Sequence, residues 1–246
     1  MTPNKSLHAP TDFRKYRAVT FDCYGTLIDW DTGVSTILAP WTVKVGLLLT
    51  MDDFLGQFAD AQRVHQITDP FKPYRQVLAD AFADVATANG HPADAEDLAA
   101  FSRSVGTWPP FSDTVWILRQ LKKKYVLGVM SNVDDESFSA THKLLGGLID
   151  EIITAEQVQS YKPAAPHFEE MLKRLADKGI SKEEVLHVAQ SRFHDIEPGN
   201  RLGLKTIWID RRGPKRGRGI TVASQAEPAY RFESLAEFFE ATVSDA

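Results

Sequence analysis

The sequence predicts an α/β protein in which a parallel β-sheet core carries an inserted helical subdomain. Short runs rich in β-branched residues alternate with helical segments at the start of the chain and again after residue 108. This alternation is typical of a parallel sheet with right-handed crossovers. Between them, residues 33–107 have apolar residues three or four positions apart and no convincing strand, as amphipathic helices require. We therefore expect a core made of residues 16–32 and 108–246, with residues 33–107 inserted as a helical cap.

The expected cap divides into helical segments with recognisable ends. Thr50 and the acids that follow it offer an N-terminal cap to the second segment, and Asn89-Gly90 ends the third. The apolar positions that define the segments are Val34, Ile37, Leu38 and Trp41; Phe54, Leu55, Phe58 and Ala61; Val77, Leu78, Ala81, Phe82 and Val85; and Leu98, Phe101 and Val105.

The core elements follow from the same patterns. Residues 18–21 form a short β-rich run that ends at an acid, and residues 125–130 form an apolar, β-branched run of strand length after a helix over 113–124. The remaining expected elements are a helix over 135–145, a strand over 151–154, a helix over 166–178, a strand over 185–189, a helix from 195 to about 203, a strand over 206–209 and a helix over 234–243.

Composition and charge exclude several classes of protein. The chain has 246 residues, of which 43% are hydrophobic and 25% charged, so it can bury a full core. A net charge of −5 does not indicate a surface that binds nucleic acid. No apolar run has the length of a membrane span or the pattern of a secretory signal. The single cysteine, Cys23, excludes an intrachain disulfide and fits a reducing compartment. We expect a soluble, cytoplasmic protein without nucleic-acid or membrane partners, with a mobile polar leader over residues 1–15.

Polar residues follow four predicted core strands. Asp22 comes after the first strand, Ser131-Asn132 after the second, Lys162 in the loop after the third and Asp195 beyond the fourth. The carboxyl ends of parallel strands meet at one edge of a sheet, so these residues are expected to line one pocket. A carboxylate that attacks carbon has to be held ionised, and a lysine lowers its pKa while hydroxyl and amide donors fix its oxygens.

Each of these residues also has a plain structural interpretation. An aspartate after a strand often only caps a turn, which would apply to Asp22, and Ser131-Asn132 would cap the helix that follows. Lys162 would then be an exposed cation on a loop. The pattern favours a reaction in which Asp22 is the nucleophile and Lys162 its partner.

Residues 19–27 read VTFDCYGTL, and this segment resembles the first motif of the haloacid dehalogenase superfamily. The tyrosine at the third motif position is similar to the 2-haloacid dehalogenase branch, and the other three strand ends match the remaining motifs in order. The resemblance implies a Rossmann-like core with a helical cap, and hydrolysis of short 2-haloacids to 2-hydroxy acids through a covalent ester on Asp22. It also implies that Thr26 hydrogen-bonds Asp22, that Asp195 orients Lys162 or the attacking water, and that the protein is a homodimer.

Two departures from the superfamily's phosphatases bear on a metal. Their second motif aspartate is replaced by Tyr24, and the first acid of their fourth motif is replaced by Gln190. Magnesium prefers anionic oxygen ligands, and Asp22 and Asp195 alone make a poor site for it. We expect no metal and no other cofactor. The alternatives are a magnesium-dependent phosphatase of a small phosphate ester and a binding module without turnover.

The resemblance assigns substrate contacts as well. Ser131 and Asn132 would hold the substrate carboxylate or the attacked ester oxygen, Tyr24 would face the substrate, and Gln190 and Ser191 would replace the residues that position water. His194 is either a base beside Asp195 or a solvent-facing side chain. Arg63 and Trp41 are candidates for the halide cradle, together with Trp30 and His65, although each also fits ordinary surface or core. The basic, glycine-rich residues 211–219 are expected to form a solvated loop, with an anion site as the alternative.

Overall fold

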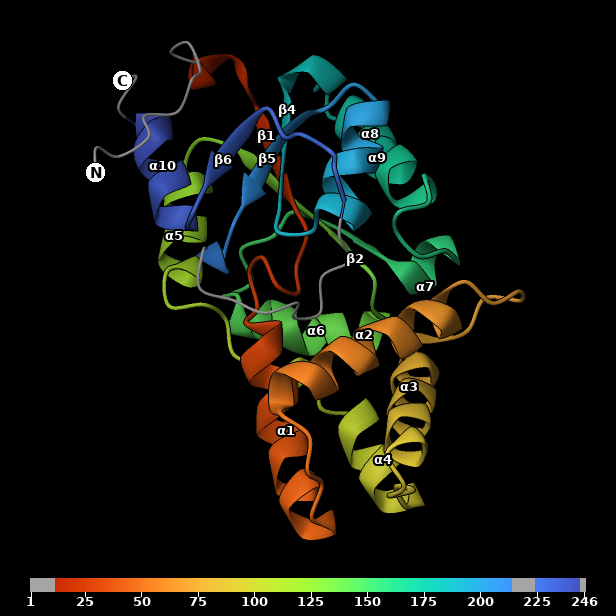
Figure 1. The fold of residues 1–246 in the computed structure, drawn as a ribbon. Helices are drawn as coiled ribbons and strands as arrows, with labels where there is room; N and C mark the ends of the chain where they lie inside the picture. Colours follow the sequence, from red (N-terminus) through yellow and green to blue (C-terminus); the bar gives the residue numbers. More distant parts are fainter. Residues whose placement is uncertain (1–11, 214–223, 244–246) are drawn as a thin grey trace.

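The computed structural model describes residues 12–213 and 224–243 (Figure 1). Its centre is a six-stranded sheet in the order β3-β2-β1-β4-β5-β6, and every neighbouring pair of strands is parallel. The strands are β1 (Ala18–Phe21), β2 (Val126–Ser131), β3 (Glu151–Thr154), β4 (Val185–Ala189), β5 (Lys205–Ile209) and β6 (Tyr230–Phe232). The predicted parallel α/β core is confirmed.

Helices cover both faces of the sheet. In Figure 1, α5 and α10 lie on one side, and α8 and α9 on the other. The core helices are α5 (Thr114–Leu121), α6 (Asp135–Leu144), α7 (Ala155–Val158), α8 (Pro166–Asp177), α9 (Glu197–Arg201) and α10 (Leu235–Val243). Successive strand residues alternate between the faces: Leu127 belongs to the larger apolar cluster, whereas Met130 packs with Phe168 and Met171 of α8.

The helical insertion lies between β1 and β2, as expected. It consists of α1 (Trp30–Val45), α2 (Met51–Gln66), α3 (Tyr74–Ala88) and α4 (Ala95–Ser102), which extend away from the sheet in Figure 1. Thr50 accepts a hydrogen bond from the backbone N–H of Asp53, so it is the N-cap of α2 that the sequence predicts. Among the described residues, no helix has the length and apolar character needed to cross a membrane.

The cap has an aromatic interior of its own. Trp41 packs edge-to-face on Phe82 with ring centroids 4.9 Å apart, and Phe58 packs in the same way on Phe101 at 5.3 Å. Trp41 is only 5% exposed. The Trp41 side chain packs the cap helices together, which agrees with the core interpretation and does not support a halide contact.

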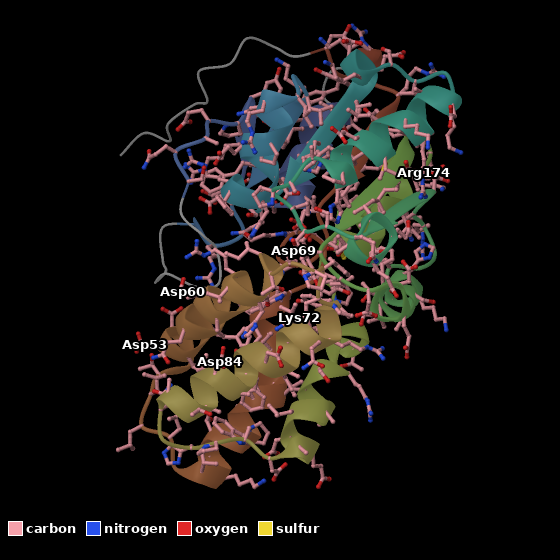
Figure 2. All side chains as sticks on the ribbon, turned by 90° about the vertical axis from the view of Figure 1, so that its right-hand side faces the viewer. Asp53, Asp60, Asp69, Lys72, Asp84 and Arg174 are labelled. Atoms are coloured by element: carbon pink, nitrogen blue, oxygen red, sulfur yellow. The ribbon has the colours of Figure 1, made fainter. Side chains whose placement is uncertain are left out.

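Aromatic side chains join the cap and the core in at least two places. Trp108 is buried, with its ring edge-to-face on Tyr24, which follows β1, and on Trp30 of α1. At the other side, Tyr161 donates a hydrogen bond of 2.7 Å to the carbonyl of Lys72 and stacks on Phe71. Figure 2 labels Lys72 and Asp69 in this loop between α2 and α3.

Some elements differ from their sequence prediction. The three-residue strand β6 at the edge of the sheet is not predicted, and the helix expected from Asp195 is instead a π-helical turn, Arg192–Ile196, followed by α9. Phe13 lies in the expected leader but is 4% exposed and packs against Tyr230 and Phe238. Residues 1–11 of that leader lie outside the described residues.

Gly33 of α1 tests the packing of the cap on the core. A Cβ built there would lie 2.4 Å from Cγ of Trp108, whereas a Cβ at Gly56 of α2 would meet nothing within 4 Å. We predict that Gly33→Ala lowers the free energy of unfolding by about 1–3 kcal/mol because the buried indole has to move. The matched change Gly56→Ala is predicted to raise it by about 0.5–1 kcal/mol, since alanine restricts the unfolded chain. Urea unfolding of both variants measures these effects, and equal effects would contradict the described contact.

Candidate active site

The ends of the central strands converge on one pocket between the core and the cap. Asp22 follows β1, Asn132 follows β2 and Asp195 lies beyond β4, and all three line a cavity of about 340 Å³ together with Lys162. The cap contributes the wall formed by α1 and α2, including Trp30, Gln62, Arg63 and Gln66. The predicted residues therefore lie together, as expected for residues that follow the carboxyl ends of parallel strands.

The Lys162 ammonium is the centre of the site. Its Nζ lies 2.9 Å from Oδ1 of Asp22, 2.7 Å from Oδ1 of Asp195 and 2.8 Å from the carbonyl of Met130. The three donors of the ammonium thus have three acceptors, and its side chain is 1% exposed. Two buried carboxylates share this one cation, which makes Lys162 the partner of Asp22 that the sequence predicts.

Thr26 fixes the other oxygen of Asp22. Its hydroxyl donates to Asp22 Oδ2 at 2.7 Å and accepts from the backbone N–H of Gln190 at 2.8 Å. The connecting turn passes through Gly25, whose φ of 94° favours glycine. Thr26 therefore links the loop after β1 to the loop after β4 and holds the carboxylate in one orientation.

The environment separates the two carboxyls electrostatically. Burial raises the pKa of Asp22 above its ordinary value, against the attraction of Lys162. Burial acts on Asp195 in the same direction, but Lys162 and a hydrogen bond from His187 outweigh it and lower the pKa of Asp195 to about 2. Asp195 is thus the more acidic of the two, and Asp22 the more basic.

Asn132 and Ser131 differ from their expected roles. The Asn132 amide accepts from the backbone N–H of Lys162 at 2.7 Å and donates to the carbonyl of the same residue at 3.1 Å. It lines the pocket but also holds the lysine loop in place. Ser131 is fully buried as the last residue of β2, it is not among the residues that line the cavity, and its hydroxyl has no partner within the described ranges. A direct contact of Ser131 with a substrate is therefore not supported.

Four of the remaining predicted residues line the cavity. Tyr24 lines it while its phenol oxygen lies 2.7 Å from Thr141 Oγ1, and Gln190 and Ser191 follow β4. Ser191 accepts from the backbone N–H of His194 at 3.0 Å and lies 3.1 Å from its Nδ1. His194 is half-buried on the pocket wall, and burial lowers its pKa to about 4, so it is neutral near pH 7.

Two arginines that follow β5 were not among the site residues predicted from the sequence. Arg211 lies over the ring of Phe111 at 4.1 Å, donates to the carbonyl of Thr26 at 2.9 Å and pairs with Asp113 at 2.9 Å. Arg212 pairs with Asp31 of α1, and both arginines line the cavity. The basic stretch was expected to be a solvated loop, with an anion site as the alternative, and the position of Arg211 and Arg212 at the cavity favours the alternative for these two residues. Residues that follow β5 are expected at the same edge of the sheet as those that follow β1, β2 and β4, so this argument would have placed Arg211 and Arg212 at the pocket. Residues 214–219 lie outside the described residues.

The donor atoms present do not fit magnesium. Oδ1 of Asp22 and Oδ1 of Asp195 both accept from Lys162, and Tyr24 and Gln190 stand where further acids would be needed. Within residues 12–213 and 224–243, no group of three histidine, cysteine or acidic side chains is arranged to hold a metal. We therefore derive no step through a metal ion.

Comparison with known proteins agrees with this fold. A family model described as "Haloacid dehalogenase-like hydrolase" matches residues 19–209. The L-2-haloacid dehalogenase from Xanthobacter autotrophicus superposes with a TM-score of 0.76 at 16% identity, over 92% of this chain and 97% of that one. The HAD-hydrolase YfnB from Bacillus subtilis, solved with magnesium, gives 0.74 at 19% identity, over 92% and 98%.

Among curated proteins, the pyrimidine 5'-nucleotidase PynA of Streptococcus pneumoniae is 29% identical over 94 residues. The match covers 38% of this chain and 38% of PynA, so it spans well under half of that relative.

His167, beside the site, yields a prediction on acid stability. Burial and the nearby Lys162 lower its pKa from 6.5 to about 3, and its Nε2 donates to the carbonyl of Ser131 at 3.2 Å. Between about pH 6.5 and 3, the unfolded chain therefore binds a proton at His167 that the folded chain does not. The stability that neutral His167 allows is fully present above about pH 6.5 and is lost as the pH falls towards 3. We predict that His167→Gln makes the loss of unfolding free energy between pH 6 and 4.5 shallower by up to about 1.4 kcal/mol per pH unit.

Urea unfolding at several pH values measures the two slopes. His194 and Asp195 remain in both proteins and cancel in the comparison. Identical slopes would show that His167 is not held neutral in the folded chain.

Proposed function

We propose that this chain, which belongs to the haloacid dehalogenase-like hydrolase family, hydrolyses the carbon–halogen bond of short 2-haloalkanoic acids and releases 2-hydroxy acids. The observation that carries the proposal is the Asp22 carboxylate, held by Lys162 and Thr26 at the wall of a pocket whose donor atoms do not fit magnesium. An attack on carbon needs no metal, because the leaving group is a halide ion.

In the first step, an Asp22 oxygen attacks the carbon that carries the halogen. A carbon–oxygen bond forms, the carbon–halogen bond breaks, and the halide leaves with its electron pair. The ester of Asp22 is neutral, so Lys162 then remains paired with Asp195 at 2.7 Å. The raised pKa of Asp22 supports this role because a more basic carboxylate is a better nucleophile once it is ionised.

In the second step, water attacks the ester carbonyl. Asp195 lines the pocket, and its Oδ2 is buried without a hydrogen-bond partner among the described residues, so a water that enters beside it would find an acceptor there. With a pKa of about 2 it is a weak base, and it takes the proton only as the new carbon–oxygen bond forms. His194, neutral on the same wall, is the other candidate base. Collapse of the intermediate restores the Asp22 carboxylate, and each turnover yields one 2-hydroxy acid, one halide and one proton.

Arg63 of α2 is proposed to hold the anionic end of the substrate or the departing halide. Four cationic side chains line the described pocket. Lys162, Arg211 and Arg212 each pair with a carboxylate, whereas Arg63 makes no ion pair within the described part of the chain. Its free guanidinium matches a carboxylate in charge and geometry. We further propose that residues 33–107 act as the cap that closes this site.

Halide release is the first test. We predict that chloroacetate, fluoroacetate or one enantiomer of 2-chloropropionate releases halide in the presence of EDTA, and that Asp22→Asn abolishes this release. Mass spectrometry of the protein during turnover should detect the ester on Asp22.

An aryl phosphate with and without magnesium is the control, since the similarity to PynA makes phosphate-ester hydrolysis the alternative. Phosphate release that depends on magnesium, without halide release from any haloacid, would contradict the proposal. Binding of haloacids without turnover in either assay would indicate a binding module and would contradict it as well.

The role of Arg63 gives a second prediction. Arg63→Gln should raise KM for the haloacid by about 10- to 100-fold, as expected when a charged hydrogen bond is lost. Arg63→Lys should recover part of this loss. The matched control is Arg103→Gln, since Arg103 is an exposed arginine after α4 that does not line the cavity. An unchanged KM in Arg63→Gln would remove Arg63 from the site.

A further inference from the structure

A buried histidine contacts the site from the interior of the sheet and has no part in the reaction described so far. His187 lies on β4 and is fully buried. Its Nε2 is 3.2 Å from Oδ1 of Asp195, and its Nδ1 is 3.0 Å from Oγ1 of Thr20. Thr20 is the direct neighbour of His187 in the register of β1 and β4. A line of polar contacts therefore runs from Thr20 through His187 and Asp195 to Lys162 and Asp22.

The contacts determine which ring nitrogen carries a proton. An ionised carboxylate only accepts hydrogen bonds, so Nε2 of His187 has to be the donor to Asp195. The Thr20 hydroxyl can then donate to Nδ1 of a neutral ring. Alternatively, it can donate to the carbonyl of Leu186, which lies 3.2 Å away, and accept from Nδ1 of a charged ring. In both arrangements, the same N–H is directed at Asp195.

The charge balance explains why Asp195 needs this donor. Asp22 and Asp195 place two carboxylates in the interior, and Lys162 supplies one ammonium that also bonds to the Met130 carbonyl. A buried carboxylate with too few donors is costly. With His187, Oδ1 of Asp195 has two donors. Asp195 therefore competes less with Asp22 for the Lys162 ammonium.

Through this bond, His187 also controls the orientation of Asp195. Oδ1 is occupied by Lys162 and His187, so Oδ2 is left as a buried oxygen without a partner among the described residues, and a water that enters beside it would satisfy it. We propose that His187 is a positioning residue that holds Asp195 so that Oδ2 accepts the proton of the hydrolytic water. This inference rests on the proposed function and assigns His187 to its second step, breakdown of the ester.

Two substitutions at His187 separate a hydrogen-bonding role from packing. The ring packs edge-to-face on Phe168, with centroids 5.4 Å apart. His187→Phe keeps a ring for this contact and removes the N–H, whereas His187→Gln loses the ring and keeps an N–H near the position of Nε2. A positioning role predicts that the glutamine variant retains more activity, and a packing role predicts the opposite order.

The experiment follows halide release from the best haloacid substrate in single-turnover and steady-state modes. We expect His187→Phe to keep the first, stoichiometric burst of halide and to lower kcat by about 10- to 100-fold, the usual effect of losing a partner that orients a reacting group. KM should change much less, and the ester on Asp22 should accumulate in the mass spectrum. His187→Gln should recover a substantial part of kcat. The kcat of Thr20→Val should lie between those of His187→Gln and the wild type.

The opposite results would overturn the proposal. A kcat of His187→Phe equal to that of the wild type, or a phenylalanine variant faster than the glutamine variant, would show that His187 only packs the core. Loss of the burst together with kcat would place its effect on the first step. Thermal unfolding of each variant verifies that the comparison is made between folded proteins.

A second measurement keeps the inference testable if no haloacid is turned over. Proton and nitrogen NMR of the histidine rings should reveal a ring N–H protected from exchange that is absent in His187→Gln and shifted in Asp195→Asn, distinct from the N–H that His167 donates to Ser131. This signal would support the bond to Asp195 even if the proposed substrate were wrong. A ring N–H of His187 that exchanges freely or does not respond to Asp195→Asn would overturn the inference independently of the substrate.

Discussion

The constraint on which the site depends is one buried ammonium shared by two carboxylates. Lys162 satisfies Oδ1 of both Asp22 and Asp195, and neither acid could be ionised at this depth without it, because the desolvation of an unpaired charge is large. The three residues come from three separate loops at the same edge of the sheet. The parallel topology is therefore what allows a single cation to organise them. The same ammonium occupies one oxygen of each carboxylate and places a positive charge where a metal ion would have to bind both acids, which restricts the chemistry available to Asp22.

Much of this arrangement could be predicted from the sequence because it depends on local patterns. Periodicity identified the cap helices, and the strand-end rule brought Asp22, Lys162 and Asp195 to one pocket. Periodicity cannot tell which apolar residue of a helix faces a neighbouring helix and which faces a pocket, so the sequence left Trp41 open between the interior of the cap and the halide site. The partner of a polar group depends on segments far away in the chain, which explains why Asn132 binds the lysine backbone. Arg211 was expected mainly in a solvated loop because of its charge, whereas the ring of Phe111 and the carboxylate of Asp113 hold it at the pocket.

The polar line through His187 illustrates how a sheet interior can serve a reaction at its edge. Burying a histidine among the apolar residues of β4 would ordinarily cost stability, because its ring nitrogens need hydrogen-bond partners. Here its two nitrogens have partners in Thr20 and Asp195, so no ring donor or acceptor is left without one. Strand β4 thus supplies packing surface and also orients the Asp195 carboxylate through His187. A substitution at His187 would therefore affect both the stability of the core and the reaction.

The size of the pocket has a consequence for the timing of the proposed reaction. A cavity of about 340 Å³ has the volume of roughly ten water molecules in the liquid, several times more than a two-carbon acid displaces. An ester formed on Asp22 from such a small acid would therefore already be surrounded by solvent, and no water would have to diffuse in before hydrolysis. The lifetime of the ester would be set by how well one of the resident waters is deprotonated and aligned. Longer acids would fill the same space, displace these waters and leave fewer nucleophiles beside the ester, so acid length would act on turnover through hydration as well as through fit.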